Sequence, residues 1–537
     1  MSPGDSRYTD GLTAIWMGGI LSLLCYRAAT QAITFDEAAT GQAFVDGPLS
    51  NAFIWDFGNH LLFTLLAKAT TAFLGTSEFA LRLPTLLGAV LYVASIWLLG
   101  RRVLPSAEKR LACVAILTLN PLVLDFLCAA RGYGLALGLF MMAACLLHMA
   151  ADRGGWQQAW RALIAGALLG LSVTASLPFL TPILGLGAGF ALLATLNRRP
   201  EKPRWGRVLR VGLCVGLPAG AVSLALLLPH FMQFHNTGGL QSFPGLDSPW
   251  KSLRSLFCGA VLSRWCPIWT TRDSEQQGWV GPAADVGAYC LLTGLLVVAG
   301  AHAAMAIYRK VRGKSLAGLE TSPQEDRRRN LQLLMGAGAV GWLFFAAVLH
   351  AAAGVSYPVD RGVIFLVPTL TWYCVLIGRG SRPARQGGKV RLGSWAKMAI
   401  ALSVAALYAL QLRVGWFREW RYDAGSRRVY EQITMRTKGT VAVGSLWFYA
   451  PSLSFYHHFR GASQTWLLAS LRVESKAEWK SMASVRVSDG NNARAFDYFV
   501  LNENEWSPSS GGESALGREV YRDPVSRAIL LQLTRPP

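Results

Sequence analysis

Charged residues are scarce in this sequence. Asp, Glu, Lys and Arg make up 15% of its 537 residues, whereas hydrophobic residues make up 52%. A soluble globular protein carries about 25% charged residues. The apolar residues occur in runs, most of which reach the roughly 17–25 residues that cross the hydrocarbon core of a bilayer. The composition therefore argues against an ordinary soluble protein and predicts a polytopic membrane protein.

Motifs for several common kinds of chemistry are also missing. The nine cysteines form no CxxC pair and no metal-ligand spacing, which argues against a zinc site or a dithiol redox motif. The sequence contains no Gly-rich phosphate loop, no Ser/His/Asp signature and no internal repeat. In a chain with long apolar runs, the net charge of +21 indicates membrane topology rather than nucleic-acid binding.

Eleven apolar segments are predicted to span the membrane. They are residues 11–29, 79–100, 111–127, 132–151, 162–177, 179–196, 208–228, 285–308, 331–352, 362–378 and 398–413. A further apolar stretch, residues 59–74, is short and contains Lys68, so we expect it to be interfacial or re-entrant. The first segment is interpreted as an anchor. The rival interpretation is a cleaved signal peptide, but the run is long for an h-region and the preceding residues are not clearly basic.

The distribution of basic residues predicts the orientation of these segments. Lys and Arg gather in every second connection and are sparse in the others; the rich connections are residues 101–110, 152–161, 197–210, 309–330 and 379–397. The positive-inside rule therefore places the amino terminus in the cytoplasm of an inner (plasma) membrane and the chain beyond residue 413 outside. Loop 229–284 is then external, and its Cys258 and Cys266 are predicted to form a disulfide.

The C-terminal residues 414–537 have the composition of a soluble domain. Residues 427–436 and 451–459 are predicted to be helical, and residues 440–444, 496–501 and 528–533 to be strands. Helices that alternate with strands indicate a small α/β domain. The predicted fold class is thus an all-α polytopic membrane protein with a small C-terminal extracytoplasmic α/β domain. The predicted domains are a transmembrane domain, residues 1–413, and this external domain, residues 414–537.

Four polar features are predicted to meet at the external face, each at the end of an apolar segment. They are Asp36-Glu37, Asn59-His60, Arg131-Gly132-Tyr133 and Asp360-Arg361. Arginine suits phosphate, because its planar fork makes bidentate, charge-assisted hydrogen bonds. A carboxylate suits a hydroxyl that must lose a proton. Paired acids beside a membrane span are costly to hold near lipid and are therefore candidates for a functional site.

Each of these residues also has a purely structural interpretation. Asp36 and Glu37 would cap a short helix over residues 37–45. His60 would be an interfacial histidine with satisfied hydrogen bonds, and Arg131 would extend toward lipid headgroups. Arg82, inside the second span, is expected to bind Glu78 or a backbone carbonyl rather than substrate.

The order of these features resembles that of the GT-C membrane glycosyltransferases, in particular the family 39-like branch with protein O-mannosyltransferases and lipid A aminoarabinose transferase. The resemblance covers roughly residues 1–413, and its most specific part is the stretch 59–84. Further matching motifs are Asn120-Pro121, Ala130-Arg131-Gly132-Tyr133, and Asp360-Arg361 before Val367-Pro368. Two positions depart from the pattern: Leu61 replaces a common proline, and Ala129 replaces a common glutamate.

The resemblance implies a membrane glycosyltransferase that moves a sugar from a polyprenyl-phosphate donor to an extracytoplasmic glycan, lipid or protein. Asp36 matches the catalytic acid and Glu37 its companion, whereas His60 and Arg131 match positions near the donor phosphate or the acceptor. Tyr133 and Arg361 are expected to contribute to substrate binding. No cofactor is required by the sequence, and a divalent cation is left open. Two rivals stay open at this point, a transporter or flippase of a lipid-linked glycan and a membrane scaffold.

Overall fold

A computed structural model gives the fold of the chain. It describes residues 3–533 except 105, 153–155, 197–203, 235–244, 264–279, 312–321, 377–391, 461–463, 473–485, 490–491 and 504–516. The described part groups into two compact units. The first contains residues 1–25, 53–63 and 84–412, and the second contains residues 26–52, 64–83 and 413–537.

Helices make up nearly all of the chain before residue 413. The α-helices there are α1 Pro3–Thr30, α2 Phe35–Thr40, α3 Leu61–Leu74, α4 Glu78–Val103, α5 Ala107–Leu119, α6 Pro121–Phe126, α7 Gly132–Ala151, α8 Trp156–Ala175, α9 Leu180–Leu196, α10 Arg204–Phe234, α11 Pro249–Ala260, α12 Val280–Val311, α13 Pro323–Ala353, α14 Leu366–Leu376 and α15 Leu392–Ala409. Short π or 3₁₀ turns occupy Gly41–Val45, Leu49–Phe53, Leu177–Phe179 and Asp360–Val363. This part of the molecule has no strand in its described residues.

Eight described helical segments are long and apolar enough to cross a membrane. They lie in α1, α4, α7, α8, α9, α10, α12 and α13, where the sequence predicts spans. The remaining three predicted spans correspond to shorter helices, namely α5 with α6, α14 and α15. The polytopic, mostly helical character predicted from the sequence is therefore confirmed.

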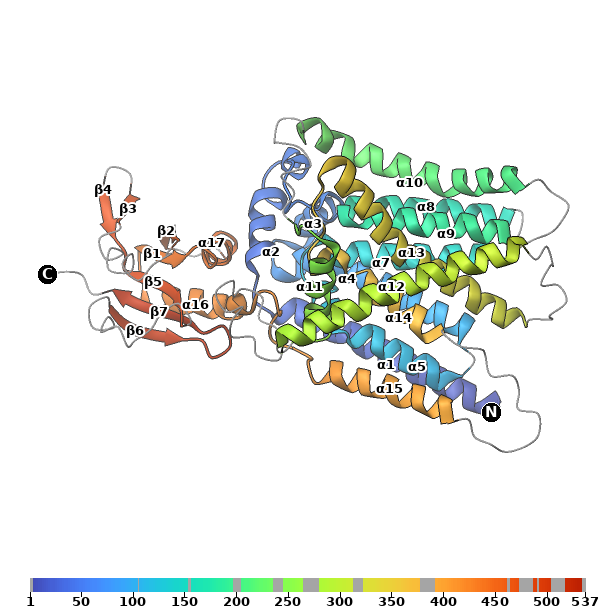
Figure 1. Ribbon diagram of the computed structural model, residues 1–537. Helices are drawn as coiled ribbons and strands as arrows, with labels where there is room; N and C mark the ends of the chain where they lie inside the picture. The colour runs from blue at the N-terminus through green and yellow to red at the C-terminus, as the bar shows by residue number, and fades with distance from the viewer. Residues whose placement is uncertain are drawn as a thin grey trace. The chain divides into compact units, whose positions relative to one another are not determined.

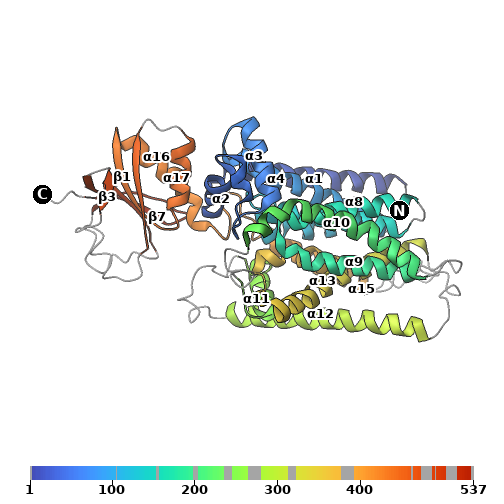
Figure 2. The ribbon, with the colours of Figure 1, turned by 90° about the horizontal axis from the view of Figure 1, so that it is seen from above.

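The helices of the first unit pack along one another. Figure 1 shows α7, α8, α9 and α10 running alongside one another, and Figure 2 shows the same for α8, α9 and α10. α13 packs against α9. Glycines permit close approach: a Cβ atom on Gly341 of α13 would lie 2.2 Å from the Cα atom of Gly185 on α9. Helices associate in membranes largely through such small-residue contacts, because lipid is as apolar as the side chains that face it.

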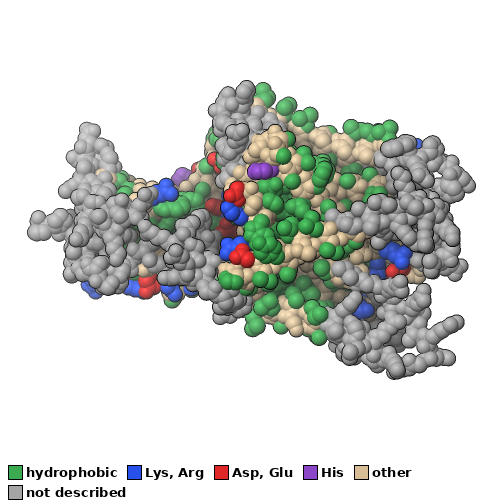
Figure 3. Space-filling model, in the orientation of Figure 1, with side chains coloured by type: hydrophobic (Ala, Val, Ile, Leu, Met, Phe, Trp, Pro, Cys, Tyr) green, Lys and Arg blue, Asp and Glu red, His purple; other side chains and the backbone are tan. Residues whose placement is uncertain are grey.

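The outer face of the helical part is largely apolar. Figure 3 shows hydrophobic side chains spread over this face, with few charged groups among them. On α10, for example, Leu213, Leu217, Leu224 and Leu228 are all exposed. In water such a row would be unfavourable, whereas in a bilayer it faces a solvent of matching polarity. The exposed leucines thus fit the predicted membrane environment.

Two local expectations are corrected by the structure. The third predicted span is interrupted, because α5 ends at Leu119 and a new helix begins at Pro121. Asn120 caps this second helix by accepting a hydrogen bond from the backbone of Val123, and proline at the first helical position starts a helix but cannot continue one. The predicted loop 229–284 also contains a helix, α11, which Ser248 caps. Cys266 of the predicted disulfide lies outside the described residues.

The C-terminal domain contains helices α16 Ser426–Arg436 and α17 Ala450–Phe459. Its strands are β1 Thr440–Leu446, β2 Thr465–Leu471, β3 Arg486–Asp489, β4 Asn492–Ala495, β5 Tyr498–Asn502, β6 Gly517–Arg522 and β7 Ala528–Leu533. Five of these strands form one sheet in the order β2-β1-β5-β7-β6, and β3 pairs with β4. Strand β1 runs parallel to its neighbours β2 and β5, whereas β7 is antiparallel to its neighbours β5 and β6. The predicted α/β character is confirmed, and β2, β3, β4 and β6 are additions to the prediction.

The parallel part of the sheet is covered by helices. α16 and α17 contact each other and lie beside the sheet in Figure 2. Strand β5 is buried along its whole length, as expected for a strand between covered faces. The chain segments 26–52 and 64–83 belong to the same compact unit as this domain. The predicted acidic loop and the C-terminal domain can therefore be described together.

Candidate active site

The acidic pair lies in the first turn of a short helix. Thr34 precedes α2 and its hydroxyl accepts a hydrogen bond from the backbone N–H of Glu37, while the Glu37 carboxylate accepts one from the backbone N–H of Thr34. This reciprocal pattern is a capping box, and it explains why the helix starts at Phe35. Both Asp36 and Glu37 are in the first turn, where a negative charge is favoured by the helix dipole.

Glu37 is buried and binds Arg82 with both carboxylate oxygens. Arg82 Nε donates to Glu37 Oε1 at 2.8 Å, and Nη2 donates to Oε2 at 2.6 Å. Neither side chain is accessible to solvent. The same guanidinium donates to the backbone carbonyls of Ala28, Gln31 and Ala32. Arg82 therefore binds backbone carbonyls, as expected, but the carboxylate that it binds is that of Glu37, whereas Glu78 binds Arg427 at 2.7 Å.

Asp36 differs from Glu37 in its surroundings. It is partly exposed, whereas Glu37 is only 1% exposed. Since the two residues are adjacent in one helical turn, they point in different directions. Geometry thus separates the pair into an acid that solvent can reach and an acid that fixes the loop through Arg82.

The other predicted residues gather in the first unit. The ring of His60 contacts that of Tyr133 edge-on, with centroids 4.8 Å apart. Arg131 lies just before Tyr133, is 5% exposed, and donates to the Gly58 carbonyl at 3.3 Å. Gly132 makes this approach feasible, since a Cβ atom there would lie 2.7 Å from the Cβ and Cγ atoms of His60.

Arg361 completes this cluster. Its guanidinium lies over the Tyr133 ring, 5.9 Å from the centroid. Burial lowers the pKa of His60 well below its usual value, and the positive charges of Arg131 and Arg361 lower it further, against a hydrogen bond with the Ala175 backbone. The ring is therefore neutral at pH 7. We call His60, Arg131, Tyr133 and Arg361 the cation cluster.

One nitrogen of the His60 ring lacks a hydrogen-bond partner among the described residues. His60 is 6% exposed, and its Nε2 atom is buried without a hydrogen bond among the described residues. Burying a polar atom without a hydrogen-bond partner destabilises the folded protein by about 1–3 kcal/mol. Such atoms are therefore rare, and a missing ligand or water is one explanation for them. With two guanidiniums near it, a neutral imidazole nitrogen suits an anionic or hydroxyl-bearing ligand.

A divalent cation has no ready-made site in the described part of the chain. His, Cys, Asp and Glu side chains there form no group of three or more that could hold a metal ion.

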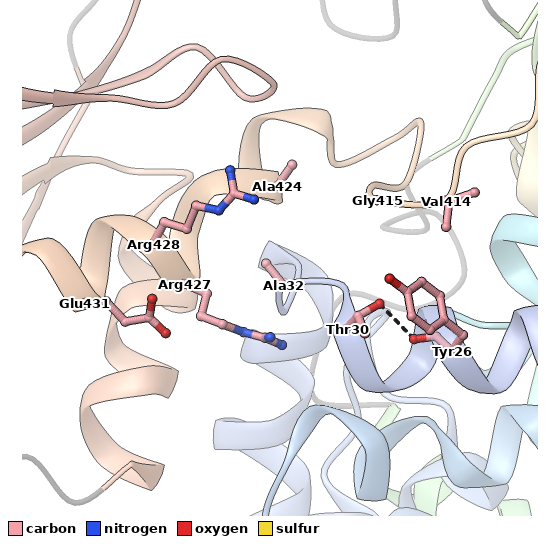
Figure 4. A pocket seen from close by; sticks show the side chains of 9 residues that line it. All are labelled: Tyr26, Thr30, Ala32, Val414, Gly415, Ala424, Arg427, Arg428 and Glu431. Carbon is pink, nitrogen blue, oxygen red and sulfur yellow. Dashed lines mark hydrogen bonds between the residues drawn. The ribbon is translucent and has the colours of Figure 1, made fainter.

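A cavity of about 410 Å³ lies within the second unit. Figure 4 shows the end of α1 with Tyr26 and Thr30 on one side of this cavity and Arg427, Arg428 and Glu431 of α16 on the other. Its charged groups are already engaged within the protein: Arg427 binds Glu78, Arg428 lies 3.4 Å from Asp523, and Glu431 pairs with Arg460. These pairings account for the charged groups that line the cavity.

The structure brings together some of the predicted residues. His60, Arg131, Tyr133 and Arg361 are neighbours in the first unit, and Asp36 and Glu37 are neighbours in the second. Sequence reasoning missed the partners of the acidic loop, above all Asp423, Tyr456 and Arg427. Their signal was absent, because they lie about 400 positions away and belong to no local motif.

Comparisons with known proteins give matches in structure only. No protein-family model and no curated protein sequence matches the chain. ArnT from Cupriavidus metallidurans, bound to undecaprenyl phosphate, matches with a TM-score of 0.47 and 11% identity over 97% of this chain and 98% of that one. The archaeal oligosaccharyltransferase AglB from Archaeoglobus fulgidus, in complex with an inhibitory peptide and a dolichol-phosphate, matches with a TM-score of 0.39 and 13% identity over 96% and 74%. At these identities and TM-scores the two matches assign this chain no family, no substrate and no residue role.

Proposed function

We propose that this protein is a membrane glycosyltransferase that moves a sugar from a polyprenyl-phosphate donor to an extracytoplasmic acceptor. The observation that carries the proposal is the cation cluster, in which two guanidiniums lie near a buried, neutral histidine at the ends of apolar helices. A phosphate headgroup with a lipid tail needs both features, positive charge at the boundary and apolar surface beside it. The acceptor is a glycan, a lipid or a protein of the cell envelope.

In this proposal Asp36 is the general base. Its carboxylate takes the proton of the acceptor hydroxyl as the hydroxyl oxygen attacks the anomeric carbon. The bond between that carbon and the phosphate oxygen breaks on the opposite side, and the phosphate leaves with the electron pair. Direct displacement of this kind inverts the configuration at the sugar. The partial exposure of Asp36 supports this role, since a base must reach its substrate.

The cation cluster is assigned to the departing phosphate. Negative charge grows on the phosphate oxygens during the reaction, and positive groups fixed in advance at that point stabilise the transition state. Arg131 and Arg361 supply this charge, and the Nε2 atom of His60 supplies a neutral hydrogen-bonding partner. Tyr133 holds His60 and Arg361 in place through its ring. Glu37 is assigned a positioning role, because both its oxygens bind Arg82.

The proposal is tested most directly by mass spectrometry of lipid-linked sugars and envelope glycans in cells that lack the protein. A polyprenyl-phosphate sugar should accumulate, and one glycan, lipid or protein should lose that sugar. The purified protein should then transfer the labelled sugar from the synthetic donor. If purified wild-type protein transfers none of the donors that accumulate, while it moves them across vesicle membranes, it is a transporter and the proposal fails.

Replacement of Arg131 tests the assignment of the cation cluster to phosphate. Hydrogen bonds to charged groups contribute about 1.5–3 kcal/mol, so Arg131→Ala should lower kcat/KM for the donor by roughly ten- to a hundredfold. Both KM and kcat should change, since the phosphate is bound before and during transfer. Arg131→Lys should recover only part, because an ammonium lacks the planar fork.

A matched control for this prediction is Arg110→Ala. Arg110 is also largely buried in the first unit, but it pairs with Asp10. Its loss should leave the donor KM unchanged in a steady-state assay with synthetic donor. Equal effects of the two substitutions on KM would contradict the phosphate role of Arg131.

The proposal also requires the C-terminal domain to lie outside the cytoplasm. In a background without other reactive cysteines, Glu519→Cys on β6 should be labelled in intact spheroplasts by a membrane-impermeant thiol reagent. Gln324→Cys at the start of α13 should be labelled only after lysis, because the positive-inside rule places that end in the cytoplasm. Both positions are exposed. The opposite labelling pattern would place the cation cluster and Asp36 on the wrong side for an external acceptor.

A further inference from the structure

The backbone around Asp36 is held by side chains from two distant parts of the sequence. Within the loop, the N–H of Thr34 donates to Glu37 and that of Glu37 donates to Thr34. From the C-terminal domain, Tyr456 Oη accepts from the Ile33 N–H at 2.8 Å, and Asp423 Oδ2 accepts from the Phe35 N–H at 2.6 Å. The N–H groups of residues 33, 34, 35 and 37 are therefore all bound by side chains.

Asp423 is well placed to hold the start of α2. It lies in the 3₁₀ turn Arg421–Gly425 and is 1% exposed. Its second oxygen, Oδ1, accepts from Ser452 Oγ at 2.7 Å and from Ser426 Oγ at 3.1 Å. Because both oxygens are engaged, the carboxyl group has one orientation, and the Phe35 N–H that it binds is immediately before Asp36.

Aromatic contacts hold the same segment. The rings of Phe35 and Trp447 meet edge-on, with centroids 5.5 Å apart. Gly41, one residue past the end of α2, approaches the ring of Phe455 on α17, which a Cβ atom at that position would meet at 3.5 Å. Hydrogen bonds and packing from the C-terminal domain thus act on both ends of the short helix that carries Asp36.

The burial of Asp423 fits a holding role rather than a catalytic one. Burial raises its pKa well above the usual value, hydrogen bonds from Ser452, Phe35 and Ser426 oppose this rise, and the nearby charge of Asp36 adds to it. A raised pKa makes Asp423 less prone to carry a second negative charge beside the proposed base.

We propose that Asp423 and Tyr456 are positioning residues that fix Asp36 for transfer, and that the C-terminal domain thereby serves the reaction as a clamp on the acidic loop. This inference rests on the proposed function, because it assigns the clamp to the base of that reaction. A shift of about 1 Å in a reacting group can cost roughly a hundredfold in rate. A helix of six residues is too short to hold its own position, so outside contacts must do so.

The experiment combines amide hydrogen exchange with transfer kinetics on the full-length purified protein. Asp423→Ala should make the amides of residues 33–37 exchange at least about tenfold faster, because the opening of the loop is no longer opposed. It should lower kcat by roughly ten- to a hundredfold and change the donor KM by less than about threefold. Asp423→Asn should restore both readouts, since an amide accepts from Phe35 through its oxygen and donates to Ser452.

Asp497→Ala is the matched control. Asp497 also accepts a backbone N–H with a carboxylate oxygen, from Ala442 at 2.9 Å, but both partners lie inside the C-terminal domain. Its loss should lower the melting temperature and leave kcat and the exchange of residues 33–37 unchanged. If Asp423→Ala does not fold, Tyr456→Phe replaces it, because that substitution removes only the hydroxyl, which accepts from Ile33 and also bonds Arg427.

The outcomes separate this inference from the proposed function. Normal exchange at residues 33–37 and normal kcat in folded Asp423→Ala or Tyr456→Phe would overturn the clamp while transfer by the wild type stands. Equal loss of kcat in Asp497→Ala would also overturn it, since a general loss of stability would then explain the effect. If the wild-type protein transfers no donor, the proposed function fails and the clamp on Asp36 fails with it as a catalytic device.

Discussion

Replacing Asp36 with asparagine should nearly abolish sugar transfer and leave the fold and donor binding almost intact. Asparagine has the shape of aspartate but cannot take a proton, and a general base contributes roughly 10²–10⁴-fold to a rate. The side chain is partly exposed, so the substitution leaves no buried charge without a partner. The measurement is transfer of labelled sugar from a synthetic polyprenyl-phosphate donor in detergent, with the expression of each variant checked.

Asp46→Asn is the control for this prediction. Asp46 lies in the same loop, is exposed, and pairs with His458 on the surface at 3.2 Å. Its neutralisation removes one negative charge from the loop and should leave transfer at the wild-type rate. If Asp36→Asn retains more than about a tenth of wild-type transfer, another group accepts the proton.

The second large effect concerns the buried pair of Arg82 and Glu37, and it is an effect on stability. Arg82→Ala should lower the free energy of unfolding by about 3–5 kcal/mol, because it leaves a carboxylate buried without its partner. Three backbone carbonyls also lose a donor. A denaturant titration of the purified protein, followed by the fluorescence of its tryptophans, measures the loss.

Two further variants test whether that loss of stability comes from the buried pair. Arg522→Ala removes a cation that binds Glu503 and Glu519 on the surface, and such exposed pairs contribute about 0–1 kcal/mol. The double variant Arg82→Met, Glu37→Leu removes both buried charges and should be more stable than Arg82→Ala alone. If Arg82→Ala costs no more than Arg522→Ala, the buried pair does not hold the acidic loop.

Much of the helical architecture follows from local sequence. The long apolar runs predict the helices α4, α7, α8 and α9 closely, because a helix that crosses the bilayer must be mostly apolar along its whole length. The capping of α2 by Thr34 and Glu37 is likewise a pattern of four neighbouring residues. Helix α11 was missed because its 12 residues are too few and too polar for a membrane span, although they are amphipathic. The break at Pro121 was missed because the apolar run continues across it, and local capping by Asn120 decides the outcome.

The cation cluster was predicted in part. The sequence indicates that His60, Arg131 and Arg361 end apolar segments on one side of a membrane, and topology alone makes them candidates for neighbours. It does not indicate that the His60 ring meets Tyr133, or that Nε2 is buried without a partner. Those features depend on how closely the chain packs at Gly132, and packing is a property of pairs of segments rather than of either one.

Composition by itself determined that this is a membrane protein with many helices, since apolar runs and basic connections each have a direct physical meaning in a bilayer. The positions of Asp36 and Arg131 at the ends of apolar runs also marked them as candidates for catalysis or substrate binding. Only the tertiary structure decided which acid is partly exposed and which is buried against Arg82, and only it showed that Asp423 and Tyr456 bind the backbone beside Asp36. A hydrogen bond between residues 35 and 423 leaves no periodic trace in the sequence, since its energy depends on a distance in space and not on spacing along the chain.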